Sequence, residues 1–165
     1  MNNNKFHINL LTIAIIAALI VSCGDGLAPI NAKSYLKGKI IYKNGKQDWP
    51  PKDSVFAVRV VAFKIYPPKD ILGEIIAKNA YFTPETTTLF SDTASFEIEI
   101  PESPVELKYI AVAQQYDSSI IAERAIGVYS TAGDQTKPSS LLIEKNKSYY
   151  IEIFIDFKNP PPQPF

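Results

Sequence analysis

Short apolar alternations, separated by turn residues every ten to twenty positions, run along the chain from Tyr35 onward. Successive side chains of a β-strand point to opposite faces, so an alternation with period two predicts a strand that is buried on one face. The clearest run is residues 95–100, where Phe96, Ile98 and Ile100 alternate with Ser95, Glu97 and Glu99. We expect this strand to turn its apolar face to a core and its polar face to water.

Further strands are predicted at residues 36–42, 107–115, 125–129, 141–144 and 149–157, with residues 144–147 as a hairpin connection. Residues 55–66 are apolar on both faces, which predicts a central strand between two layers. Residues 81–92 are rich in threonine and are expected to be irregular or edge-like. Asp70 is placed to cap a short helix whose apolar face would comprise Ile71, Leu72, Ile75 and Ile76.

These elements predict an all-β fold, a Greek-key-type β-sandwich of about seven strands with at most one short helix. Asn44-Gly45 predicts a tight turn, because Gly supplies the positive φ that such a turn requires. The two prolines in residues 47–53 (QDWPPKD) exclude a central strand there. We expect the sandwich to span residues 35–158 and the proline-rich tail, residues 159–165, to be extended and polyproline-like.

The N-terminal segment predicts export. A nearly continuous apolar run from Ile8 to Val21 is too short for a membrane span, which needs about 20 residues, and it follows the weakly basic start typical of signal peptides. Its end, Ile20-Val21-Ser22-Cys23, resembles the lipobox of bacterial lipoproteins. The resemblance implies that residues 1–22 are a cleaved signal peptide, that Cys23 is acylated, and that residues 23–34 form a lipidated tether. An ordinary secretory signal with an incidental cysteine is the alternative.

Composition limits the chemistry of the 143 residues that would remain after cleavage. Cys23 is the only cysteine, so no disulfide is expected. The 17 basic and 17 acidic side chains of the chain balance, which leaves no electrostatic footprint for nucleic acid. The only histidine, His7, lies in the predicted signal peptide, which excludes a Ser-His-Asp triad, a Cys-His pair and a histidine-ligated zinc from the exported part. We therefore expect no enzyme, no catalytic residue, no metal site and no cofactor.

Residues 38–64, which read Gly-Lys-Ile-Ile-Tyr, a turn, a loop and then Val-Arg-Val-Val-Ala-Phe, resemble the start of transthyretin-like and carboxypeptidase-regulatory-like domains. The segments Leu142-Ile143-Glu144 and Tyr150-Ile151-Glu152-Ile153 are similar to the hairpin with which those domains end. The resemblance implies a compact Greek-key-type sandwich and no particular chemistry. The chain departs from the family at Asp53-Ser54, where a small Gly-Ala pair is usual, and its exported part lacks the histidines on which the family's hydroxyisourate hydrolases depend.

Carboxylates are the remaining candidates for chemistry. Glu97 and Glu99 share a strand face at a separation of about 7 Å, which falls in the range of an inverting glycosidase pair, although a solvated strand face explains them more simply. Aspartates in presumed loops offer oxygen ligands for Ca²⁺ without forming a spaced D-x-D run; these are Asp48, Asp53, Asp92, Asp117 and Asp134.

The best candidate for a contact surface is the loop at Trp49, Pro50 and Pro51. Prolines hold the local backbone, so an aromatic ring there loses little entropy on binding, and Trp is enriched at binding hot spots. The alternative is that Trp49 folds over one end of the sandwich as a lid on the core.

The sequence thus predicts a non-enzymatic envelope protein that is anchored to membrane lipid through Cys23 and binds or scaffolds an unidentified envelope protein or glycan, not nucleic acid. A carbohydrate-binding module on a lipid tether and a calcium-dependent adhesion domain are the alternatives. A lidded Trp49 favours a scaffold, whereas an exposed aromatic stack favours sugar. Gly24, rather than Asp, follows the cysteine, which mildly favours the outer membrane.

Overall fold

The computed structural model describes residues 33–84 and 86–164. The predicted signal peptide, Cys23 and the tether up to residue 32 lie outside these residues. The described residues belong to one compact unit, Lys33–Phe165, whose first strand begins at Ser34, one residue before the predicted start of the domain. No helix in this part of the chain is long and apolar enough to cross a membrane.

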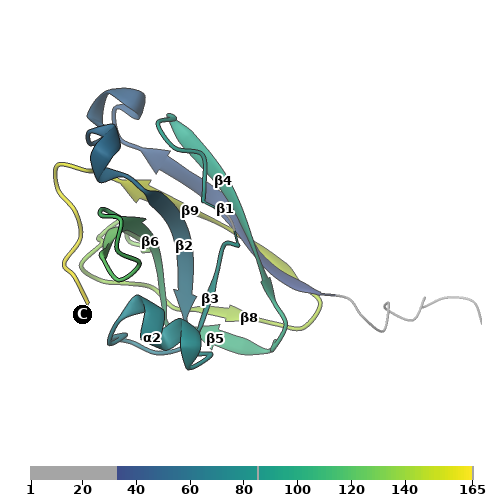
Figure 1. The fold of residues 1–165 in the computed structure, drawn as a ribbon. Helices are drawn as coiled ribbons and strands as arrows, with labels where there is room; N and C mark the ends of the chain where they lie inside the picture. The colour runs from purple at the N-terminus through teal and green to yellow at the C-terminus, as the bar shows by residue number, and fades with distance from the viewer. Residues whose placement is uncertain (1–32, 85, 165) are drawn as a thin grey trace, which may run out of the picture. The chain divides into compact units, whose positions relative to one another are not determined.

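The first layer is a three-stranded sheet in the order β4-β1-β9 (Figure 1). β1 (Ser34–Tyr42) lies at its centre, antiparallel to β4 (Thr93–Ile100) and parallel to β9 (Ser148–Ile155). In β4 every second residue is buried and the residues between are exposed, which confirms the alternation predicted for residues 95–100. The first and last strands of the domain therefore lie side by side.

The second layer is a four-stranded antiparallel sheet in the order β3-β2-β6-β7. Its strands are β2 (Ala57–Phe63), β3 (Ala80–Phe82), β6 (Tyr109–Gln115) and β7 (Glu123–Val128). β2 is buried on both faces, as predicted: Val60 faces the main core, whereas Val61 and Phe63 belong to a second, smaller cluster on the opposite face. The short edge strand β3 and the irregular chain after it confirm the expectation for residues 81–92.

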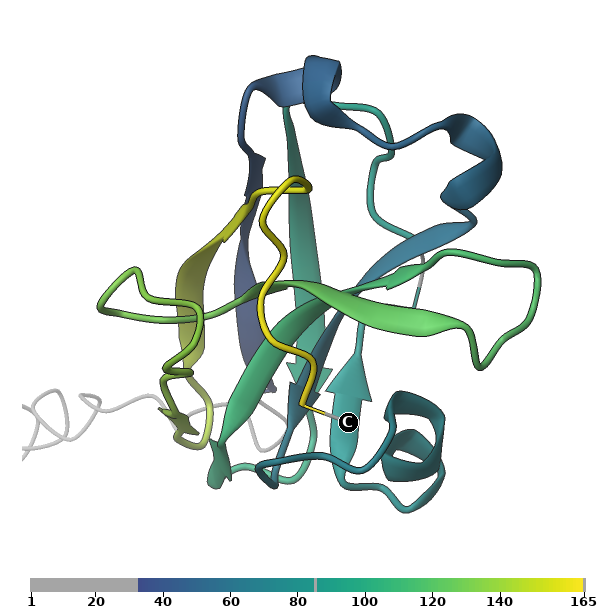
Figure 2. The same ribbon diagram turned by 90° about the vertical axis from the view of Figure 1, so that its left-hand side faces the viewer.

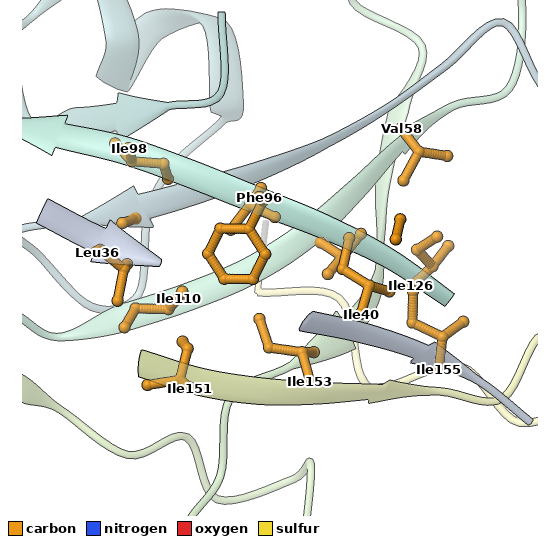
Figure 3. Close-up of a cluster of buried hydrophobic side chains, with 14 of the residues drawn as sticks. Leu36, Ile40, Val58, Phe96, Ile98, Ile110, Ile126, Ile151, Ile153 and Ile155 are labelled. Atoms are coloured by element: carbon orange, nitrogen blue, oxygen red, sulfur yellow. The ribbon is translucent and has the colours of Figure 1, made fainter. Parts of the chain in front are cut away.

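The main core lies between the two layers (Figure 3). Its labelled members include Leu36 and Ile40 from β1, Phe96 and Ile98 from β4, and Ile151, Ile153 and Ile155 from β9, which face Val58, Ile110 and Ile126 of the second sheet. Gly38 makes room for this packing, because a Cβ there would lie 2.6 Å from the Phe96 ring and would collide with the carbonyl oxygen of Ile151.

A third, two-stranded sheet pairs β5 (Val105–Leu107) with β8 (Leu141–Ile143). The predicted hairpin at residues 144–147 is therefore wrong, since β8 pairs with β5 while β9 pairs with β1. The reason lies in the Ser34 hydroxyl of β1, which donates to the carbonyl oxygen of Glu144 (3.0 Å) and accepts from the amide of Asn146 (2.9 Å). These bonds hold the connection against β1, so the chain crosses from one sheet to another.

The predicted helix is present as α2 (Ile71–Ile76), and the Asp70 carboxylate caps it by accepting from the amide of Gly73 at 2.5 Å. Its predicted apolar face is partly wrong, because Ile76 is 73% exposed whereas Glu74 is buried. Positions one, four and five of a helix share a face, and Ile75 at position five packs against the second core cluster, whereas positions two and six, here Leu72 and Ile76, point to another side. Burial of Glu74 is tolerated because its carboxylate accepts from Lys69 N and Asn79 Nδ2.

Two 3₁₀ turns, η1 (Gly45–Asp48) and η2 (Lys52–Ser54), occupy the predicted loop between β1 and β2. Asn44 and Gly45 both have positive φ, 58° and 59°, as a tight turn there requires. At the other end of the chain, residues 160–164 form no ladder and run across the second sheet (Figure 2). The described residues thus form an all-β sandwich of nine strands with one short α-helix, which confirms the predicted fold class.

Candidate functional site

Trp49 lies at the end of the sandwich where β1 stops, inside a cluster of aromatic rings. Its ring centroid is 4.5 Å from that of Tyr42 and 5.0 Å from those of Phe90 and Phe157. Tyr42 is itself buried and stacks in parallel on Phe157 at 5.8 Å. The indole therefore packs against the core, with Pro50 half-buried beside it and Pro51 exposed.

Polar contacts hold the Trp49 loop in place. The indole N–H donates to the carbonyl oxygen of Ser91 at 2.9 Å, so the polar atom of the ring is already engaged. Asp48 pairs with Lys158 at 2.7 Å, and this hydrogen bond holds the pKa of the Asp48 carboxyl below its usual value. Lys43 and Asp156 form a second ion pair at 2.6 Å. The loop is a closed cap that joins the ends of β1 and β9.

A second candidate surface is the outer face of the first sheet along β9. Tyr150 is 66% exposed and Phe154 is 58% exposed, although their neighbours Ile151, Ile153 and Ile155 are buried in the core. In the parallel register, Tyr150 lies opposite Lys37 and Phe154 lies opposite Ile41 of β1. We call Tyr35, Ile41, Tyr150 and Phe154 the β9 aromatic face; the two residues from β1 are half-buried.

β9 is also an edge strand. Over the described residues it forms a ladder only with β1, and its far end approaches β7, where a Cβ on Gly127 would lie 3.0 Å from the Phe154 carbonyl oxygen. An edge strand presents backbone donors and acceptors that another chain can pair with. The β9 aromatic face thus adjoins an edge that a second polypeptide can extend.

Charges around the β9 aromatic face are balanced by pairs across β1 and β4. Lys37 Nζ lies 2.8 Å from a Glu97 carboxylate oxygen and 4.9 Å from the centroid of the Tyr35 ring. Lys33 pairs with Glu99, also at 2.8 Å. The two carboxylates considered as an acid-base pair are therefore exposed partners in surface ion pairs, and neither is desolvated as a general acid would be.

A shallow groove of about 250 Å³ lies between β4 and residues 83–84 and 86–88. Hydroxyl groups dominate its lining: Thr83, Thr86, Thr87, Thr88 and Ser95, together with Pro84, Phe96 and Glu97. The buried hydroxyls have backbone partners on β2, since Thr87 donates to Val58 O at 3.1 Å and Thr83 accepts from Val60 N at 3.3 Å. The lining also presents the hydroxyls of Thr86, Thr88 and Ser95.

Across residues 33–84 and 86–164, no three acidic, histidine or cysteine side chains lie close enough together to hold a metal ion. Asp48 and Asp134 instead bind neighbouring side chains, namely Lys158 and Thr136.

Sequence reasoning missed the β9 aromatic face. The signal that marks it is the pair of aromatic residues on the outer face of β9, Tyr150 and Phe154 on either side of Glu152, in contrast to β4, whose outer face carries Ser95, Glu97 and Glu99. Apolar residues on both faces of residues 55–66 predict burial, which is confirmed for β2 (Ala57–Phe63), whereas Phe56 and Tyr66 beyond its ends are exposed. In β9 the same pattern accompanies one buried and one exposed face.

No family model, curated protein or solved structure matches this chain. The resemblances to lipoprotein signal sequences and to transthyretin-like domains therefore stay predictions from the sequence.

Proposed function

We propose that this chain is a lipid-anchored protein of the cell envelope whose β-sandwich binds a second envelope protein through the β9 aromatic face, without catalysing a reaction. Cys23 would carry the acyl anchor, and the outer membrane is the preferred location. The observation that carries the binding proposal is the exposure of Tyr150 and Phe154 beside an unpaired sheet edge. Aromatic residues are enriched at protein interfaces, where they dominate the binding energy.

The surroundings of Trp49 argue against glycan binding at the predicted loop. A sugar-binding platform needs a free ring face, whereas three aromatic rings surround Trp49 and Ser91 accepts its N–H. Trp49, Pro50 and Pro51 would accordingly support the scaffold by closing its end, and contact with the partner would come from β9.

Site-specific photocrosslinking tests the binding surface. A benzophenone amino acid placed at Tyr150 should give a discrete adduct in native envelopes, whereas the same probe at Leu142, which is 56% exposed on β8, should give none. Adducts of equal yield at both positions would mean that crosslinking only reports exposure, and the binding proposal would fail.

Radiolabelled fatty acid tests the anchor. Label should enter the wild-type protein and be absent from Cys23→Ser, because the thiol is the acylated group. Equal labelling of both proteins would refute the lipoprotein proposal and the localisation that rests on it.

Carbohydrate binding in the threonine-lined groove is the second candidate function. Its hydroxyls and the Glu97 carboxylate are polar groups that a sugar can hydrogen-bond. Calorimetric titration with envelope oligosaccharides should show binding that is weakened in Thr88→Val and unchanged in Tyr150→Ala. The opposite dependence would assign the oligosaccharide to the β9 aromatic face.

A further inference from the structure

The hydrogen bonds between β1 and β9 fix which backbone groups of β9 point away from the sheet. β9 runs parallel to β1. The Tyr35 amide donates to the carbonyl oxygen of Lys147 at 3.0 Å, and the Lys43 amide donates to that of Ile155 at 2.8 Å. In a strand, the N–H and C=O groups of successive residues point alternately to its two sides. The odd-numbered residues of β9 therefore direct their backbone groups to β1.

The even-numbered residues of β9 direct their N–H and C=O groups away from β1; these are Ser148, Tyr150, Glu152 and Phe154. The packing of β7 supports this direction, because a Cβ on Gly127 would lie 3.0 Å from the Phe154 carbonyl oxygen. β7 therefore approaches the far end of β9. Toward its start β9 is open: Ser148, Tyr150 and Glu152 are exposed, and within residues 33–84 and 86–164 the strand forms a ladder with β1 alone.

Two other sheet edges carry features that discourage the addition of a strand. The side-chain amides of Gln163 and Gln135 bond to the backbone of β7, and β4 presents the charged side chains of Glu97 and Glu99. Covering segments and charged side chains are the usual protection of an edge strand. The exposed face of β9 instead carries two aromatic rings and one carboxylate, that of Glu152. β9 is therefore less protected than either of the other edges.

The exposed side chains of β9 define what an added strand must carry. A neighbouring strand would lie about 4.8 Å away, with its outer side chains beside those of β9. Opposite charges on adjacent strands attract, and apolar side chains pack against aromatic rings. Glu152 lies between Tyr150 and Phe154 on this face. The edge thus suits an extended segment in which a basic residue stands between two apolar residues on the same face.

A second copy of β9 fits this edge less well. If Tyr150 of each copy lay opposite Phe154 of the other in an antiparallel pair, the two Glu152 carboxylates would lie directly opposite each other, which is destabilising. A pair centred on Tyr150 avoids this repulsion but sets Phe154 opposite Asn146, which lies before the start of β9. A segment of a different protein has neither constraint.

We infer that an extended segment of the partner protein adds to β9 as a fourth strand of the first sheet, paired along Ser148–Glu152, with a basic residue beside Glu152 and apolar residues beside Tyr150 and Phe154. Backbone hydrogen bonds hold the segment, and its side chains select it. This inference rests on the proposed function, because it specifies how the β9 aromatic face holds its partner. Ile151, Ile153 and Ile155 keep their places in the core, since they point inward from β9 (Figure 3).

Hydrogen exchange at single amides, followed by NMR on the complete protein, tests the pairing. The probe is a synthetic peptide of matching chemistry, acetyl-Thr-Val-Thr-Lys-Thr-Val-Thr-amide. With the peptide at about ten times its dissociation constant, exchange should slow about tenfold at Tyr150 and Glu152. Exchange at Ile151 should not change, because its amide faces β1. A peptide that only covered the aromatic rings would not produce this alternation.

Proline substitution tests the outward N–H groups. Glu152→Pro removes one such donor and leaves the ladder with β1 intact, as edge strands allow. It should bind the peptide about fivefold more weakly than Glu152→Ala, which lacks the carboxylate but keeps the N–H. Glu97→Pro is the matched control on β4: the Tyr42 amide donates to the Asp92 carbonyl oxygen, so by alternation the Glu97 N–H also points away from β1. This control should bind the peptide as the wild-type protein does.

The other outcomes contradict the inference. Shifted ring signals of Tyr150 and Phe154 without slower amide exchange would mean that the aromatic face binds but no strand is added, and the proposed function would stand. Equal weakening in Glu152→Pro and Glu97→Pro would exclude pairing at β9. Slow exchange at Tyr150 before the peptide is added, lost on dilution, would mean that a second copy occupies the edge. If the peptide does not bind, the inference fails, while photocrosslinking at position 150 still decides the proposed function.

Discussion

At the level of single residues, the indole of Trp49 packs the loop after β1 against Phe157, which follows β9. Phe90, which packs on it, has a φ of 51°, a left-handed conformation that is rare for a bulky aromatic residue. A backbone under such strain persists only where surrounding contacts hold it. The packing of Trp49 against Phe90, Tyr42 and Phe157 supplies contacts of that kind.

Trp49→Ala should therefore lower the free energy of unfolding by about 3 kcal/mol, the cost of removing a large aromatic side chain from a packed cluster. Trp49→Phe should lower the free energy of unfolding by less. Loss of the hydrogen bond to Ser91 accounts for about 1 kcal/mol of that decrease, and the smaller ring adds a packing loss. Urea denaturation followed by circular dichroism measures both. Unchanged stability in Trp49→Ala, together with weaker capture of the crosslinked partner, would return the contact surface to this loop.

Ile98 and Glu97 are adjacent residues with opposite environments. Ile98 is 2% exposed in the main core, and Glu97 faces water beside Lys37. Ile98→Ala should cost about 2–5 kcal/mol because it leaves a cavity, whereas Glu97→Ala should stay within about 0.5 kcal/mol, as exposed sites and surface ion pairs usually do. Chemical denaturation measures the free energy of unfolding of both variants. Equal losses of stability would show that the register of β4 is wrong.

At the level of elements, the two sheets differ in whether side chains cover the backbone groups of an edge strand. The outer edge of β7 is covered by side-chain amides: the Ala125 amide donates to Gln163 Oε1 at 2.8 Å, and Gln163 Nε2 donates to the Ala125 carbonyl oxygen at 2.9 Å. Gln135 Oε1 accepts from the Val128 amide at 2.9 Å. These amides take the place of a neighbouring strand, which the proline-rich tail cannot form because proline has no N–H. The contrast with β9 supports β9 as the edge that receives a partner.

Gln163→Glu should separate the two bonds of this edge cover. A carboxylate still accepts from the Ala125 amide but cannot donate to the carbonyl oxygens of Ala125 and Pro161, so we expect a loss of about 1–2 kcal/mol, the cost of two hydrogen bonds. Gln163→Ala should lose both bonds and also the protection of the Ala125 amide. Hydrogen exchange at Ala125 is the measurement, and full protection in Gln163→Ala would show that the tail does not cover this edge.

At the level of the whole molecule, two buried phenols link stability to pH. Burial raises the pKa of Tyr42 to about 12 and also raises the pKa of Tyr109 above its ordinary value. In the unfolded chain a tyrosine loses its proton near pH 10. Between about pH 10 and 12 the folded state thus binds more protons than the unfolded state, and the free energy of unfolding falls as pH rises.

The Tyr42 contribution should be complete below about pH 10 and should decline by roughly 2–3 kcal/mol by about pH 12. Urea denaturation at pH 8 to 12 measures it. Tyr42→Phe should flatten part of the decline, and Tyr109→Phe should remove a further part. A wild-type protein whose stability is constant up to pH 12 would show that these hydroxyls are not buried in solution.

The order of residues by itself determined the strands other than the short β3 and β5, the cap of α2 and the both-face burial of β2. These features depend on short-range chemistry: the period of two in residues 95–100 and the Asp70 carboxylate three positions before Gly73 act within a few residues. The all-β class followed from the same local patterns.

Only the tertiary structure decided which strands pair and which apolar faces remain exposed. β1 and β9 are more than 100 residues apart in sequence, and their parallel pairing overrides the hairpin expected between β8 and β9. Ile76 and Phe154 are as apolar as their buried neighbours, yet they face water, whereas Trp49, in a polar loop, packs against the core. Burial depends on what packs against a side chain, and in this fold those partners come from distant parts of the chain.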